Sequence, residues 1–225
     1  VSGIVVGMGS DLAITSNALS TSVTSLRVRA TNASTTCTRL LDAADAVVVN
    51  SIPLAPTITP AGATTVCEGS PGVVLNSSAG SGNQWYFNGS MLPGETGTSL
   101  IIATLPGNSG NYTVTQTVSG CSSAQSAAVS VTINALPQDR TVTPVLPTTV
   151  CSGQTVTLTV VSSQSGINYE ILDQSSNVVS GIVVGMGSDL AITSNALSTS
   201  VTSLRVRATN ASTTCTRLLD AADAV

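Results

Sequence analysis

Apolar and polar residues alternate along most of this chain in short runs, which is the pattern of β-strands that bury one face. In the first two thirds of the chain the runs predict strands at 73–78, 83–87, 100–103, 111–118 and 128–133. In the last third they predict strands at 155–161, 167–172, 178–184 and 203–208. Clusters of Gly, Pro, Asn and Ser separate these runs at the spacing that is typical of β-sandwiches. No segment keeps a convincing helical period, so the sequence predicts an all-β fold.

Two internal repeats set the expected organisation. Residues 1–47 recur without one change as residues 179–225, at an offset of 178. A fainter repeat at an offset of 84 relates residues 65–69 (Thr-Val-Cys-Glu-Gly) to residues 149–153 (Thr-Val-Cys-Ser-Gly). Such repeats indicate arrays of similar structural units. We therefore expect the chain to be a stretch of a longer array whose 178-residue period contains two related modules.

The repeats divide the chain into three segments. Residues 1–52 correspond to the C-terminal half of a preceding module B, residues 53–137 to module A, and residues 138–225 to a module B with its last strand truncated. The half module lacks its first strands and would expose an open sheet edge, so we expect it not to fold alone. Short proline-containing linkers, Ile52-Pro53 and Leu136-Pro137, favour modules arranged head to tail with limited bending.

The composition excludes most catalytic and nucleic-acid-binding functions. The seven basic residues are all Arg, and there is no His, so the commonest general base and the Schiff-base lysine are absent. No carboxylate pair has a spacing suited to acid–base catalysis, and no CxxC pair or His is present to bind zinc. The net charge is −4 with 8% charged residues, which excludes a nucleic-acid surface. No apolar run reaches the roughly 18–20 residues of a membrane span. We predict no enzyme activity, cofactor or metal site.

Module A contains the motifs of a recognisable domain type. Trp85 lies on a predicted strand and Tyr112 lies in the motif Ser-Gly-Asn-Tyr-Thr-Val. These positions resemble the core Trp and the tyrosine corner of immunoglobulin (Ig)-like domains, and imply that both side chains belong to the core. The disulfide that usually joins strands B and F is missing, because Ser77 and Val114 stand where its cysteines would be.

A narrower resemblance concerns four short motifs: Thr-Val-Cys-Glu-Gly-Ser, Gln-Trp-Tyr-Phe-Asn-Gly, Gly-Asn-Tyr-Thr-Val and Ser-Gly-Cys-Ser. They resemble the tandem Ig-like repeats of giant surface proteins in Bacteroidota, a group that includes gliding-motility adhesins. The resemblance covers module A, but it covers module B only through its opening segment and its cysteines. It implies a secreted protein at the cell surface or in an extracellular filament.

The five cysteines lie near predicted strand ends. Each module has one cysteine before strand B (Cys67, Cys151) and one after strand F (Cys121, Cys215), and Cys37 is the earlier copy of Cys215. In an Ig-like sandwich, strands B and F run the same way, so these two ends lie roughly 20 Å apart. A disulfide needs Cα atoms within about 7 Å.

We therefore favour the pair Cys67–Cys215 between modules, with Cys37, Cys121 and Cys151 bonded to cysteines beyond this chain segment. Pairing within each module, Cys67–Cys121 and Cys151–Cys215, stays the alternative. Either pairing implies an oxidising compartment.

Two functions from different classes fit these features. The first is the structural shaft of a repetitive extracellular filament or adhesin, whose partners are other copies of the repeat along the chain and, by lateral self-association, neighbouring chains. The second is a carbohydrate- or surface-binding Ig-like module, for which surface polysaccharide is the partner. Strand alternation turns Tyr86 outward, which makes it the candidate contact for a sugar.

Overall fold

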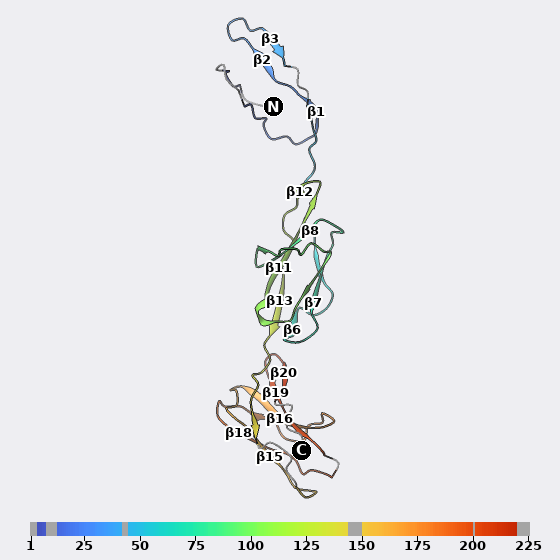
Figure 1. Cartoon of the computed structure of the whole chain (residues 1–225), viewed down its shortest axis with the longest axis vertical. Coiled ribbons are helices and arrows are strands. Elements are labelled where there is room, and N and C mark those ends of the chain that lie inside the picture. Colours follow the sequence, from blue (N-terminus) through green and yellow to red (C-terminus); the bar gives the residue numbers. More distant parts are fainter. Residues whose placement is uncertain (1–3, 8–12, 42–44, 144–149, 200, 220–225) are drawn as a thin grey trace.

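The computed structural model describes residues 4–7, 13–41, 45–143, 150–199 and 201–219. Within these residues the regular structure is β-strand, apart from one 3₁₀ turn, η1, at Pro106–Asn108. Two hydrophobic cores form, one between residues 73 and 133 and one between residues 142 and 219. Figure 1 shows the two sandwiches one after the other along the long axis, with the N-terminal segment beyond the first. The predicted all-β fold is confirmed.

The first sandwich has two sheets. One has the order β10-β7-β5, which are Ser99–Ile102, Val73–Ser77 and Ile58–Pro60. The other has the order β6-β13-β11-β8-β9, which are Thr65–Cys67, Val129–Asn134, Gly110–Val118, Asn83–Phe87 and Ser90–Met91. The short strand β12 (Cys121–Ser122) pairs with β11. The entering chain therefore changes sheets: β5 pairs with β7, whereas β6 lies parallel to the last strand, β13.

Alternating side chains fill the first core. Trp85 is fully buried and its indole N–H donates to the carbonyl of Gly97 at 2.9 Å. Tyr112 is buried against Phe87, with ring centroids 4.9 Å apart, and its hydroxyl donates to the carbonyl of Asn108 at 2.8 Å. This bond to a residue just upstream is the tyrosine corner. Burial raises the pKa of the Tyr112 phenol above its ordinary value.

The second sandwich repeats this plan. One sheet has the order β14-β15-β18, which are Val142–Thr143, Thr157–Val160 and Leu190–Thr193. The other has the order β17-β16-β19-β20, which are Val183–Val184, Ile167–Asp173, Leu204–Asn210 and Thr216–Leu219. On β19, Leu204 and Val206 are buried and Arg205 is exposed, as alternation predicts. Arg207 pairs with Glu170 on the adjacent strand, with Nη2 and Oε1 2.6 Å apart.

The strand predicted at 178–184 is wrong for most of its length. Only Val183–Val184 (β17) is regular, and Val178 and Ser180 form isolated bridges. The reason is visible at Ser180, whose hydroxyl accepts the backbone N–H of Ile171 at 2.8 Å and takes the place of a ladder carbonyl. The strand β18 was not predicted.

Buried serines use the same device in both sandwiches. Each accepts a strand N–H through its hydroxyl and donates to the carbonyl of the residue that follows it. The hydroxyl is small enough to sit inside the sheet and satisfies a backbone donor that would otherwise be costly to bury. These serines are Ser123, Ser126, Ser180 and Ser194.

The exact repeat allows the same sequence to be compared in two surroundings. In the first copy, β2 (Arg29–Thr31) pairs with β3 (Thr38–Leu40) in the same register as the equivalent residues of β19 and β20. A second pair, β1 (Val23–Leu26) with β4 (Asp45–Val47), completes the described strands there.

The burial of the two copies differs sharply. Val28 is 41% exposed and Ile14 is 40% exposed, whereas their second copies, Val206 and Ile192, are 1% exposed. The second copy packs against β15 and β16, which are supplied by the first half of that sandwich. The hairpin is therefore a local property of the sequence, but the core needs both halves.

The tyrosine corner predicts a measurable loss of stability. Tyr112→Phe removes the hydroxyl that donates to Asn108 and should lower the free energy of unfolding by about 1 kcal/mol. Urea denaturation followed by the fluorescence of Trp85, the only Trp in the chain, reports the first sandwich alone. Tyr86→Phe is the matched control and should change stability by less than about 0.5 kcal/mol. Equal effects of the two substitutions would contradict this role for Tyr112.

Candidate functional site: the junction between the two sandwiches

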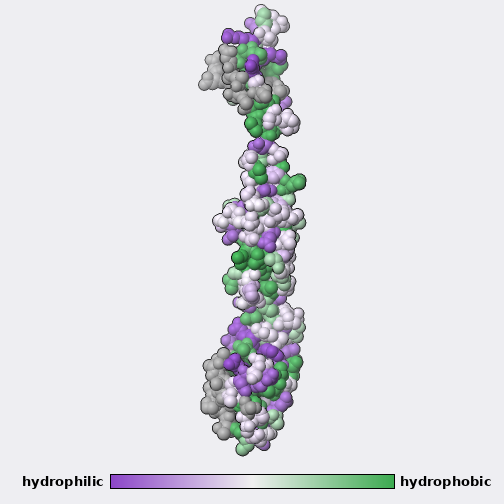
Figure 2. All heavy atoms as spheres, turned by 90° about the vertical axis from the view of Figure 1, so that its right-hand side faces the viewer, coloured by the Kyte–Doolittle hydropathy of each residue, from purple (hydrophilic) through white to green (hydrophobic). Residues whose placement is uncertain are grey.

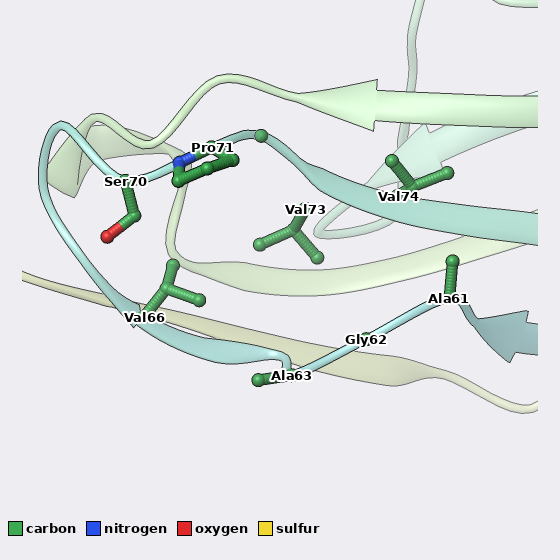
Figure 3. Close-up of a pocket in the computed structure, with 9 residues that line it drawn as sticks. Ala61, Gly62, Ala63, Val66, Ser70, Pro71, Val73 and Val74 are labelled. Carbon is green, nitrogen blue, oxygen red and sulfur yellow. The ribbon is translucent and has the colours of Figure 1, made fainter.

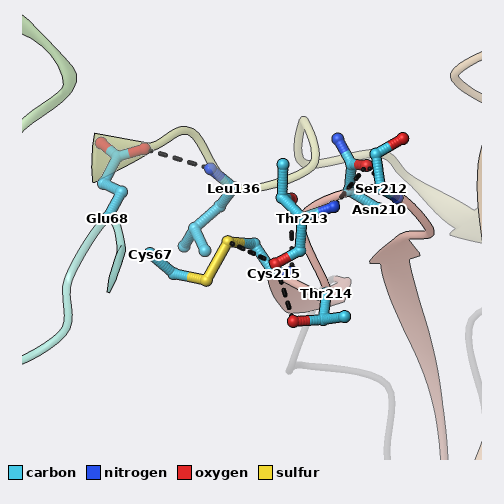
Figure 4. Close-up of a disulfide and its surroundings, with 8 residues drawn as sticks. All are labelled: Cys67, Glu68, Leu136, Asn210, Ser212, Thr213, Thr214 and Cys215. Atoms are coloured by element: carbon cyan, nitrogen blue, oxygen red, sulfur yellow. Dashed lines mark hydrogen bonds between the residues drawn. A yellow bond between two sulfur atoms is a disulfide. The ribbon is translucent and has the colours of Figure 1, made fainter. Parts of the chain in front are cut away.

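A disulfide joins the two sandwiches (Figure 4). Cys67 of the first bonds to Cys215 of the second, with Cα atoms 5.6 Å apart and a sequence separation of 148 residues. This is the inter-module pair that the topology argument favoured. Cys121 and Cys151, which the intramodule alternative would pair with them, are free in this chain, as is Cys37.

The neighbouring strands hold Cys67 at the very end of the first sandwich. Cys67 is the last residue of β6 and lies opposite Asn134, the last residue of β13. The N–H of Glu68 donates to the carbonyl of Asn134 at 2.8 Å. The Glu68 carboxylate in turn accepts the N–H of Leu136 at 3.4 Å, at the start of the linker (Figure 4). The disulfide and the exit of the polypeptide therefore lie side by side.

The turn between β19 and β20 presents Cys215. The side-chain oxygen of Asn210 accepts the N–H groups of Ser212 at 3.0 Å and Thr213 at 3.3 Å, and the N–H of Asn210 donates to the carbonyl of Cys215 at 2.9 Å. An Asn that organises a turn in this way is a common local motif. Thr214 completes the turn with φ at 59°.

The earlier copy of this turn shows what the junction adds. Asn32 makes the equivalent bonds, accepting from Ser34 and Thr35 and donating to the carbonyl of Cys37 at 2.9 Å. Cys37 is nevertheless exposed, whereas Cys215 is fully buried. The turn forms from its own sequence, so the burial of Cys215 comes from its contact with the first sandwich.

The linker is fixed on both sides. Pro137 is buried, and the N–H of Gln138 donates to the side-chain oxygen of Gln164 in the second sandwich at 2.9 Å. Asp139 lies 3.7 Å from Arg217 of β20, an exposed ion pair of small energetic value. The two sandwiches are thus connected twice, by a bound linker and by a disulfide.

The other end of the first sandwich carries Cys121. It lies opposite Val118 in the tight β11–β12 hairpin. Its sulfur is 3.7 Å from the carbonyl of Asn50, and the Asn50 side chain donates to the carbonyl of Ser119 at 3.0 Å. Cys121 therefore faces the segment that enters the first sandwich, on the side away from Cys67.

The rest of the described structure offers little that could support chemistry. A pocket of about 270 Å³ lies where the entering chain changes sheets, and its lining is apolar or backbone, with no charged side chain (Figure 3). Figure 2 shows hydrophobic and hydrophilic residues interspersed over the visible face. Tyr86 is half-buried on β8 beside Met91.

Two searches of the described residues complete this picture. Among them, no three His, Cys, Asp or Glu side chains gather where a metal ion would be held. No helix in that part of the chain has the length and hydropathy to cross a membrane.

The comparison with known protein families now bears on the first sandwich. Residues 53–135 match the family model described as "Ig-like domain CHU_C associated". No curated protein matches the chain. Ig-like domains of this kind are typically binding or structural units, which agrees with a junction built from a disulfide and backbone hydrogen bonds.

Two solved structures show limited similarity. "Human OSCAR ligand-binding domain" is 13% identical with a TM-score of 0.32, covering 76% of this chain and 96% of its own. "Crystal structure of mouse coronavirus receptor-binding domain complexed with its murine receptor" is 17% identical with a TM-score of 0.37, covering 72% and 96%. At such low scores neither similarity informs function.

The residues of this site divide by how far the sequence revealed them. Cys67 and Cys215 came from cysteine positions and strand direction. Glu68, Asp139 and Arg217 were missed, because an isolated charge on a surface strand carries no signal of its partner. Asn210 was detectable in principle, since Asn before a Ser-Thr cluster favours a turn.

Removal of the disulfide should destabilise the first sandwich. Closing the loop restricts the unfolded chain, and the combined substitution of Cys67→Ser and Cys215→Ser should lower the free energy of unfolding by about 4 kcal/mol or less. The measurement is urea denaturation, followed by Trp85 fluorescence without reductant. The control Cys121→Ser should be close to unchanged. A reductant should bring the parent chain to the stability of the double variant; no response to reductant would contradict the assignment.

Proposed function

We propose that this chain is part of the shaft of a repetitive extracellular or cell-surface filament, in which Ig-like modules follow one another head to tail. The observation that carries the proposal is the double connection at the junction: the disulfide Cys67–Cys215 beside a fixed linker. The exact 178-residue repeat supports an array of such pairs. Two connections at one junction resist bending, twisting and separation better than a single linker does.

The disulfide also supports the proposed location. Disulfides persist in oxidising compartments, such as the bacterial periplasm and cell surface. The Ig-like match of residues 53–135 is of a bacterial type associated with surface proteins. The absence of Lys and the presence of only seven Arg leave few sites for trypsin-like proteases, which suits a long exposed structure.

The disulfide limits how far the chain can be stretched. When the chain is pulled by its two ends, force passes from Cys67 directly to Cys215, and the residues between them bear none of it. That loop contains every buried residue of both hydrophobic cores except Leu219. Forced unfolding of either core therefore adds little length while the disulfide is intact.

Single-molecule force spectroscopy tests this mechanical role. Reduction should release the 148-residue separation between the two cysteines and lengthen the fully stretched chain by about 500 Å, at roughly 3.5 Å per residue. Cys67→Ser should show the long extension without reductant, and the control Cys121→Ser should behave as the parent chain. A parent chain that stretches to the same length before and after reduction would refute the proposed role.

A binding function predicts a different result. The half-buried Tyr86 is the candidate sugar contact, although the chain has only five aromatic residues and stacking platforms need exposed rings. We expect no specific binding on a glycan array probed with the full chain. Specific binding tighter than millimolar, lost in Tyr86→Ala and kept in Tyr86→Phe, would favour the binding module over the shaft.

A further inference from the structure

The cysteines that are free in this chain have the same local geometry as those that are bonded. After Cys67, the N–H of Ser70 closes a turn to the Cys67 carbonyl at 3.1 Å. After Cys151, the N–H of Gln154 closes the equivalent turn at 3.0 Å. Both turns place a glycine two residues after the cysteine, with φ at 76° and 87°, a conformation that favours glycine. Cys151 is therefore presented at the end of the second sandwich as Cys67 is at the end of the first.

Cys121 matches Cys215 in the same way. Each is the first residue after the turn that follows a long strand, and each lies opposite the last residue of that strand, Val118 or Asn210. Cys121 also contacts Asn50, on the segment that enters the first sandwich. It therefore lies at the junction with the preceding module, just as Cys215 does at the junction with the first sandwich.

We infer that Cys151 bonds to Cys121 of the following copy of the repeat, and that Cys37 bonds to Cys67 of the preceding copy. This inference rests on the proposed array. Each bond forms when two thiols lose two protons and two electrons to the disulfide of an oxidoreductase, which is reduced to a dithiol. Every junction along the shaft then carries one disulfide.

These bonds create two continuous covalent tracks along the shaft. One runs through the chain from Cys37 to Cys67 (67 − 37 = 30 residues) and crosses a disulfide to Cys215, which is Cys37 one period later. The other runs from Cys121 to Cys151 (151 − 121 = 30 residues) and crosses to Cys121 of the next copy. Each track uses 30 residues out of every 178. A fully stretched period therefore measures roughly 110 Å, instead of about 600 Å for the reduced chain.

The first sandwich carries the two tracks as neighbours. One track includes β6 and the other includes β13, and these strands are parallel and hydrogen-bonded from Thr65 to Cys67. In a sandwich held only by its two termini, the first and last strands are pulled in opposite directions and slide past each other. With both tracks closed, each strand is held at both ends, so tension does not shear the pair.

The test uses a chain with one additional period, made of residues 1–225 followed by a second copy of residues 48–225. Cys37→Ser, Cys121→Ser in the first copy and Cys151→Ser in the second leave a single Cys151 and a single Cys121 that can meet across the new junction. Cleavage after Arg and Glu without reductant places Cys121 in peptide 96–140 and Cys151 in peptide 141–170. Mass spectrometry then identifies which peptides are joined.

The expected result is a monomer in which peptides 96–140 and 141–170 are joined. The matched control is the 225-residue chain, in which the same two peptides should carry alkylated thiols. Alkylated thiols in the longer chain, with Cys67–Cys215 intact, would overturn the two tracks but leave the proposed shaft standing. Joined peptides found only in dimers would also overturn them. Loss of Cys67–Cys215 as well would reject both proposals.

Discussion

The disulfide between Cys67 and Cys215 is the constraint on which the rest of the structure depends. It lies at the end of β6, beside the point where the chain leaves the first sandwich on β13. Neither sandwich is large, and each core is built mostly from Val, Leu and Ile with few aromatic rings. Small cores give limited stability. A covalent connection at the junction lets two small sandwiches resist force together, which neither core would do alone.

The two copies of the 47-residue repeat separate local from long-range effects. The turn at Asn32 and the turn at Asn210 have the same hydrogen bonds, because the Asn side chain and its Ser-Thr neighbours suffice to form them. The burial of Val206 and of Cys215 is not local, since their first copies, Val28 and Cys37, are exposed. One sequence thus supplies a preformed turn, and the neighbouring strands and module decide what is buried.

Much of this could be predicted from the sequence. Alternation gave the strands around Trp85 and Tyr112, and strand direction gave the pairing of Cys67. The irregular strand at 178–184 could not be predicted, because Ser180 reads as an ordinary strand residue until its hydroxyl is seen to accept the N–H of Ile171. The contact of Glu68 with Leu136 and the parallel pairing of β6 with β13 also depend on segments far apart in the sequence.

Electron microscopy of a recombinant array of several 178-residue periods tests the head-to-tail shaft most directly. Two sandwiches of about 35–45 Å each predict an unbranched rod with an axial repeat of roughly 70–90 Å per period. The length of the rod should increase linearly with the number of periods. Compact particles, or an axial repeat far from this range, would contradict the account.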